Sequence, residues 1–75
     1  MFVLVQGYAI VNLERYDVVS VDPESDDDKR HMIYAWIGRE KRMPLGKYSF
    51  PRCVEVLEQL FEACQKGTGF RMPNE

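Results

Sequence analysis

The chain has 75 residues, a formal net charge of −2, two cysteines and one histidine. This length allows a single domain, residues 1–75, that buries only about 60 to 65 % of the surface exposed by its unfolded form. The acidic balance argues against a general nucleic-acid-binding protein, which normally carries a basic surplus, and neither a signal peptide nor a membrane span is expected. We therefore expect a cytoplasmic protein with reduced thiols.

The first half of the chain predicts short strands separated by turns. Residues 2–6 are apolar and β-branched, and Gly7 predicts a bend into a second extended piece over residues 8–11, as a small hairpin or one bulged strand. Residues 16–21 predict a further strand that ends at Asp22 and Pro23, because proline lacks a ladder donor. An acidic turn then leads toward His31.

The segment from His31 to Ile37 predicts a strand with no polar face. A strand with one face in water should alternate apolar and polar residues, because successive side chains point to opposite faces. Here both sets are apolar, and one helix cannot cover both. We expect a second copy of the chain, or a ligand, against the uncovered face. One set is Met32, Tyr34 and Trp36, and the other is Ile33, Ala35 and Ile37.

The second half predicts one more strand and a helix. Residues 41–48 return as a strand in which Pro44 indicates an edge or a bulge. From Pro51 to Lys66 the period becomes helical, with a start at Ser49 or Phe50 and Gly67 as the left-handed stop. The stripe expected to cover one sheet face contains Val54, Leu57, Leu60, Phe61 and Cys64.

The predicted fold is α+β: a four- to five-stranded antiparallel meander, then one C-terminal helix and a short extended tail that docks back on the sheet. Cys53 and Cys64 lie roughly 16 Å apart along the helix, too far for a disulfide, and are interpreted as buried apolar side chains. Too few ligands are present for a metal site. Self-association is the remaining way to stabilise so small a domain, so we expect a homo-oligomer.

No residue pattern indicates catalysis, and we expect neither an enzyme nor a cofactor. His31 has no nucleophile near it in sequence, and the serines lie in no nucleophile elbow or phosphate-binding loop. The acidic residues from Asp22 to Asp28 lack the glycine and glutamate that an EF-hand needs in register. They indicate a solvated loop.

Basic residues gather around the second predicted hairpin and the start of the helix. A helix N-terminus offers free backbone donors and a partial positive charge, so cations beside it favour an anion site. The tail from Phe70 to Met72 adds a ring for stacking and a guanidinium for phosphate. The alternative interpretation is an ordinary solvated turn, with Phe70 as a core anchor. The cations are Arg39, Lys41, Arg42, Lys47 and Arg52.

Three features resemble a known group of proteins: the hairpin with Asn12, the segment Leu45-Gly46-Lys47-Tyr48 before the helix, and the tail Gly69-Phe70-Arg71-Met72-Pro73. They are similar to small proteins carried by phages and prophages of Firmicutes. Within that group the chain resembles the Thoeris anti-defence family, oligomeric proteins that sequester nucleotide signals of host immunity. The resemblance implies a protein of the host cytoplasm that binds without turnover.

Two functions follow as expectations. The first is sequestration of a small anionic, cyclic nucleotide at an oligomer interface, with arginines on the phosphates and aromatic rings on the bases. The second is a protein-binding module or inhibitor that uses the uncovered apolar sheet face. A purely structural phage component is a third. The candidate ligand-binding residues are Trp36, Arg42, Lys47, Arg52, Phe70, Arg71 and Met72.

Overall fold

The computed structural model describes residues 1–6, 9–24 and 27–75, without the side chains of residues 24, 27 and 28. The bend predicted at Gly7 and the centre of the predicted acidic turn lie outside the described residues. In chain order the elements are β1 (Phe2–Leu4), β2 (Ile10–Asn12), the 3-10 turn η1 (Leu13–Arg15), β3 (Val18–Glu24), β4 (Asp27–Ile37), β5 (Lys41–Ser49), α1 (Phe50–Lys66) and β6 (Phe70–Arg71).

The strands form two sheets of three strands. β3, β4 and β5 make an antiparallel meander, whereas β1 lies between β2, which is antiparallel to it, and β6, which is parallel to it. The α+β class and the docking of the tail are confirmed, and the prediction of a single four- to five-stranded meander is wrong. The 3-10 turn η1, capped by the Asn12 side chain at 3.2 Å from the Glu14 amide, separates the two sheets.

β3 and β4 are longer than the sequence pattern predicts. β3 continues through Pro23, and its partner there is His31. The prediction that the strand ends at Asp22 is wrong because β3 is an edge strand, where the missing donor of a proline can face away from the ladder.

The pairing of β4 with β5 contains a bulge. Ile33 lies opposite Gly46 and Tyr34 lies opposite Pro44, so Leu45 is the extra residue on β5. The prediction that Pro44 marks an edge or bulge is therefore confirmed. The bulge lies where the Gln6 amide donates to the Leu45 carbonyl at 3.0 Å, which links β5 to the end of β1.

The bounds of α1 agree with the sequence pattern, but the face that it buries does not. Ser49 precedes the helix, and Gly67 ends it with a φ of 70°. Val54 and Phe61 are 39 % and 66 % exposed, and Cys64 is also exposed, so the predicted stripe is wrong at these three positions. Leu60 is buried as predicted, and Leu57 is partly buried. The buried residues of α1 are Cys53, Val56, Leu60 and Ala63.

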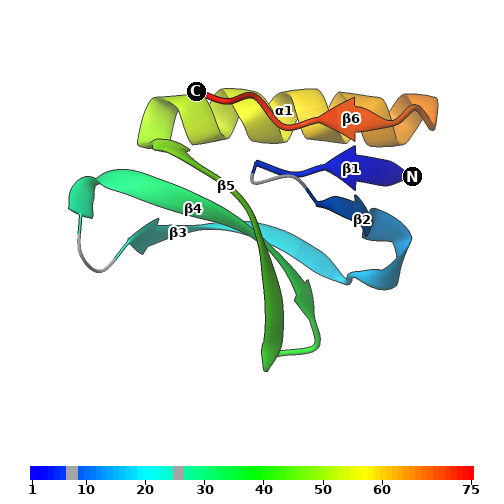
Figure 1. The fold of residues 1–75 in the computed structure, drawn as a ribbon, viewed down its shortest axis with the longest axis horizontal. Coiled ribbons are helices and arrows are strands. Elements are labelled where there is room, and N and C mark those ends of the chain that lie inside the picture. The colour runs from blue at the N-terminus through cyan, green and yellow to red at the C-terminus, as the bar shows by residue number, and fades with distance from the viewer. Residues whose placement is uncertain (7–8, 25–26) are drawn as a thin grey trace.

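The core lies between α1, the inner face of the β3–β4–β5 sheet and the β2–β1–β6 sheet. Figure 1 shows α1 beside β6 and β1, while the far end of the β4–β5 hairpin extends away from them. Ile33 and Ala35 of β4 are fully buried on the side of the strand that faces α1, whereas Ile37, at the end of β4, is 43 % exposed. Met32, Tyr34 and Trp36 lie on the opposite side, only partly covered.

Candidate functional site

The outer face of the β3–β4–β5 sheet, the face turned away from α1, is the strongest candidate site. Partners across an antiparallel ladder point to the same face, so the register defines its members. Val18 is 53 % exposed beside Trp36, which shows that apolar surface is open there. The face comprises Val18, Ser20 and Asp22 of β3, Met32, Tyr34 and Trp36 of β4, and Arg42, Pro44 and Lys47 of β5.

Arg42 lies over two aromatic rings of this face, near the β4–β5 turn. Its Cζ atom is 4.3 Å from the centroid of the Tyr34 ring and 5.7 Å from that of Trp36. The two rings meet edge to face at 6.1 Å. A guanidinium over an aromatic face is held by the ring quadrupole while its N–H groups keep their hydrogen-bonding capacity. We call these three residues the aromatic–arginine cluster.

The Trp36 ring is held in place from β3. Its Nε1 donates a hydrogen bond of 2.8 Å to Ser20 Oγ, and Ser20 Oγ lies 3.4 Å from Asp22 Oδ2. This polar chain satisfies the indole N–H and leaves the ring faces for other contacts. The cluster is thus oriented before any partner arrives.

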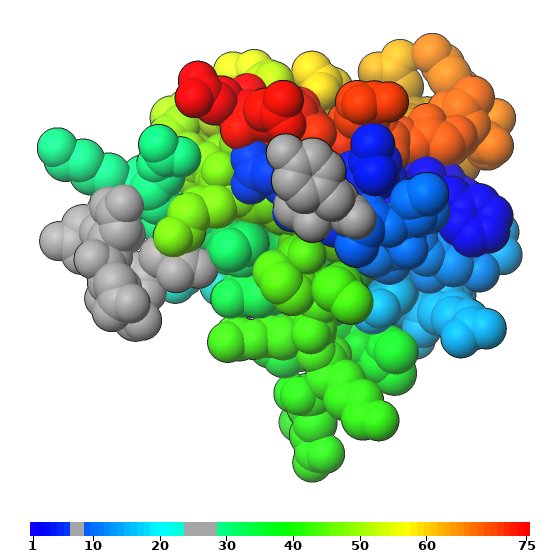
Figure 2. All heavy atoms as spheres, viewed as in Figure 1, coloured from blue at the N-terminus to red at the C-terminus, as the bar shows by residue number. Residues whose placement is uncertain are grey.

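The cluster lies in the half of the β4–β5 hairpin that is next to its turn. Residues 38–43, around the β4–β5 turn, project from the body of the protein in Figure 2. No described carboxylate forms an ion pair with Arg42, which is exposed. The guanidinium is therefore available to an acidic group from outside the chain.

Three of the seven predicted site residues lie on this face, namely Trp36, Arg42 and Lys47. Arg42 is opposite Trp36, whereas Lys47 is farther along the strand, opposite Met32. Arg52 lies elsewhere, on α1, where it donates to Glu55 at 3.0 Å and to the Glu75 carbonyl at 3.1 Å. A cavity of about 290 Å³ adjoins it at the start of α1, lined by Lys29, Arg30, Tyr48, Ser49, Arg52 and Glu75. The structure thus separates Arg52 from the aromatic residues predicted beside it.

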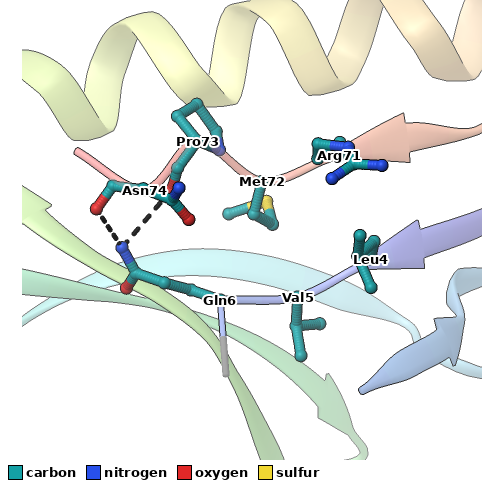
Figure 3. Close-up of a pocket in the computed structure, with 7 residues that line it drawn as sticks. All are labelled: Leu4, Val5, Gln6, Arg71, Met72, Pro73 and Asn74. Atoms are coloured by element: carbon teal, nitrogen blue, oxygen red, sulfur yellow. Dashed lines mark hydrogen bonds between the residues drawn. The ribbon is translucent and has the colours of Figure 1, made fainter. Parts of the chain in front are cut away.

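The tail residues Phe70 and Arg71 form β6 of the other sheet, and Met72 follows directly after it. Met72 is only 2 % exposed and its amide donates to the Leu4 carbonyl at 2.9 Å, while Phe70 packs against the core. Their apolar parts therefore stabilise the docked tail, as in the alternative interpretation of Phe70. Arg71 is exposed, and it lines a cavity of about 350 Å³ between β1 and the tail (Figure 3).

Gln6 organises that cavity and is a residue that the sequence analysis did not identify. Its Oε1 accepts from the Lys47 amide at 2.8 Å, and its Nε2 donates to the Pro73 and Asn74 carbonyls at 3.3 and 2.6 Å. Figure 3 shows the two donated bonds running to the tail, with Arg71 at the other end of the cavity. The polar groups of Gln6 are occupied by the fold, so the role of Gln6 is structural. No local pattern marks such a residue, because all its partners are distant in sequence.

The buried phenol and thiol beside the start of α1 are also structural. Burial raises the pKa of the Tyr48 hydroxyl, opposed by the nearby Arg52 charge, and the Cys53 thiol adds to the increase. Burial likewise raises the pKa of Cys53, while a hydrogen bond to the Tyr48 backbone lowers it. Both groups are therefore neutral near pH 7, and neither is an activated nucleophile.

Among the residues that the structure describes, no group of three or more histidines, cysteines, aspartates or glutamates is placed to hold a metal ion. Within the same residues, no helix is long and apolar enough to cross a membrane. Comparisons with protein-family models, with curated proteins and with solved structures find no match.

Proposed function

We propose that this protein is a binding module without catalytic turnover, which captures a partner protein through the outer face of the β3–β4–β5 sheet. The observation that carries the proposal is the aromatic–arginine cluster on an open sheet face. Tryptophan, tyrosine and arginine are the residue types that dominate the energetics of protein interfaces. An antiparallel sheet with one face in water normally carries polar residues there.

The cluster also defines the chemistry of the partner. Arg42 has no carboxylate partner within the described residues, and its position over two rings restricts its side chain before binding. A partner fits this face if it places an aspartate or glutamate on Arg42 and apolar side chains on Val18 and Met32. We therefore propose a protein surface with an apolar centre and at least one carboxylate.

A matched pair of neighbours on β5 tests this proposal. Lys41 and Arg42 are both exposed cations, but they point to opposite faces because they are adjacent on one strand. A photo-crosslinking residue at Val18, next to Trp36, should give a discrete adduct with a protein other than a second copy of this chain. We expect Arg42→Ala to weaken formation of that adduct at least about tenfold and Lys41→Ala to leave it unchanged. Equal effects of the two substitutions would contradict the assignment of the outer face.

Sequestration of a small cyclic nucleotide is the second candidate function. The observation that favours it is the proximity of Arg42 to the Trp36 ring, with Lys47 on the same face. An arginine for phosphate and a ring for base stacking are the groups that such a ligand needs. The resemblance to phage anti-defence proteins supports the same ligand class.

Trp36 is the only tryptophan of the chain, so its fluorescence reports on this face alone. Titration with cyclic dinucleotides and cyclic ADP-ribose isomers should change the emission if a base stacks on the indole. Saturable quenching that is lost in Arg42→Ala would favour nucleotide capture. Unchanged emission with every one of these nucleotides would argue against nucleotide capture and favour the protein-binding function.

A further inference from the structure

Helix α1 carries a second apolar stripe, which no part of the described chain covers completely. The stripe recurs at helical spacing on the flank next to the buried face, at about 100° per residue. Its largest member, Phe61, is 66 % exposed, and Phe50 is 52 % exposed. The second stripe comprises Phe50, Val54, Leu57, Phe61 and Cys64.

The second stripe faces β3 across an apolar cavity. This cavity of about 240 Å³ is bounded by Val19 of β3 and by Leu57 and Phe61 of α1, with Leu13, Leu60 and Cys64 completing its lining. The helix therefore does not cover β3 completely, and Val19 and Val21, on the inner face of this strand, are only partly buried. Apolar surface from the helix and from the strand is thus incompletely covered on the same flank.

The outer edge of β3 lies on this flank and also lacks a partner. Within the described residues β3 pairs with β4 alone, so the backbone groups on its other side have no strand beside them. The opposite edge of the sheet differs, because Gln6 bonds to the backbone of Leu45 and Lys47 on β5. An unpaired edge strand next to an apolar helix flank is an arrangement suited to pairing with another chain.

We propose that this flank binds a second copy of the chain about a two-fold axis, with β3 antiparallel to β3 and α1 antiparallel to α1. In such an interface each contact between two positions occurs twice. An axis at Ser20 places Val19 opposite Val21 of the partner copy, and Asp22 opposite Val18, so carboxylates are not paired across the strands. The two edges become the centre of one six-stranded sheet.

The helices fit the same axis. Val19, next to the axis residue Ser20, and Leu57, the midpoint of the second stripe, line one cavity, so a single axis passes close to both elements. An antiparallel helix pair centred between positions 57 and 58 places Val54 beside Phe61 of the other copy. The stripe itself is uncharged, and Glu55 and Glu62 bond to Arg52 and Lys66 of their own helix.

The exposed surface is large enough to contribute a substantial part of a dimer interface. Phe50 and Phe61 together expose roughly 240 Å² per copy, taking about 200 Å² for a whole phenylalanine. The two copies contribute this area twice, and the strand edges and the rim of the contact bury further surface. A small specific interface buries roughly 1,200 Å² in total. The outer face stays open, so a dimer presents two aromatic–arginine clusters on one continuous sheet.

Charge complementation between copies tests the proposed geometry. We expect native mass spectrometry to show a dimer of the unmodified chain, and Val54→Glu and Phe61→Lys each to raise its dissociation constant by about 30-fold or more. Mixing the two single variants should give a dimer that contains one copy of each. In this dimer the carboxylate introduced at position 54 of one copy faces the ammonium introduced at position 61 of the other. The second Val54–Phe61 contact is unchanged. Positions 54 and 61 lie about 10 Å apart on one helix, so they cannot pair within a copy.

Two controls separate this inference from the proposed function. Gln59→Lys, on the opposite flank of α1, and Trp36→Ala, on the outer face, should leave the dimer intact. Recovery of a dimer on mixing also shows that both variants fold. Three results would overturn the proposed interface: a monomeric unmodified chain, a dimer unaffected by Phe61→Lys, or single variants that fail to complement each other. None of these results would contradict the function proposed for the outer face.

Discussion

Gly46 is a residue whose missing side chain makes room for another residue of the same strand. A Cβ atom at position 46 would lie 2.6 Å from Tyr48 Oη and 2.7 Å from its Cε2, and Tyr48 is only 1 % exposed. The phenol also donates a hydrogen bond to the Pro73 carbonyl, so the ring cannot turn aside freely. We expect Gly46→Ala to lower the free energy of unfolding by about 1 to 3 kcal/mol in chemical denaturation.

Gly69→Ala is the matched control for this substitution. The nearest atom to a Cβ there is the Phe2 carbonyl oxygen at 3.4 Å, an ordinary contact distance. The effect of Gly69→Ala should therefore be clearly smaller. Equal losses at both positions would mean that chain entropy, rather than the Tyr48 ring, determines the cost at position 46.

Gln6 holds the tail to the β5 bulge through its side chain. Gln6→Ala removes the acceptor of the Lys47 amide and both donated hydrogen bonds to the tail. We expect this substitution to lower the free energy of unfolding by about 1 to 3 kcal/mol. Hydrogen exchange of the Met72 amide, which bonds to the Leu4 carbonyl, should become faster as the tail loosens. Unchanged exchange would show that β6 docks without the help of Gln6.

The raised pKa values of Tyr48 and Cys53 predict a loss of stability in alkali. A group with a higher pKa in the folded state stabilises the fold fully below its unfolded pKa, and this contribution is lost as the pH rises through the folded pKa. The ordinary values are 10.0 and 9.0, so the free energy of unfolding should decline from about pH 9 upward. Removing the phenol with Tyr48→Phe should make this decline shallower, whereas Cys64→Ser at an exposed thiol should not. Identical slopes in both variants would contradict the assignment.

At the level of elements, the orientation of α1 makes a testable difference between two valines. Val56 is fully buried and Val54 is 39 % exposed, although they are two residues apart on one helix. Val56→Ala should lower the free energy of unfolding by about 2 kcal/mol or more because it leaves a cavity. Val54→Ala should lower it by less than half of that amount. Thermal unfolding measures both. The reverse order would place the predicted stripe, rather than the observed one, against the core.

The sequence predicts the elements better than their faces. The period change at Pro51, together with Gly67, locates α1 correctly, since these signals act within a few residues. The buried face was mispredicted because two adjacent stripes of the helix are both apolar, and the smaller set, with Cys53 and Ala63, fits closer to the sheet. Parallel pairing of β6 with β1 joins chain ends far apart in sequence, and short-range patterns carry no information on it.

At the level of the whole molecule, the candidate site was predictable only in part. The two apolar faces of β4 indicate an uncovered surface, and Trp36 and Arg42 are neighbours because the short β4–β5 turn determines their register. Which face α1 covers could not be read from the sequence, since both faces are apolar. The separation of Phe70–Met72 from Trp36 follows from the second sheet, which the meander prediction lacked. Arg52 is separated from Trp36 because it lies on α1, which covers the opposite face of the β3–β4–β5 sheet.

The most direct test of the account is a photo-crosslinking residue at Val18, on the outer face, compared with one at Gln59, on the exposed far flank of α1. We predict a discrete adduct between position 18 and a protein other than a second copy of the chain. This adduct should not form from position 59. It should be lost when Trp36 or Arg42 is replaced by alanine and retained when Lys41 is replaced. An adduct with that different protein that survives both Trp36→Ala and Arg42→Ala would contradict the outer face as the binding surface.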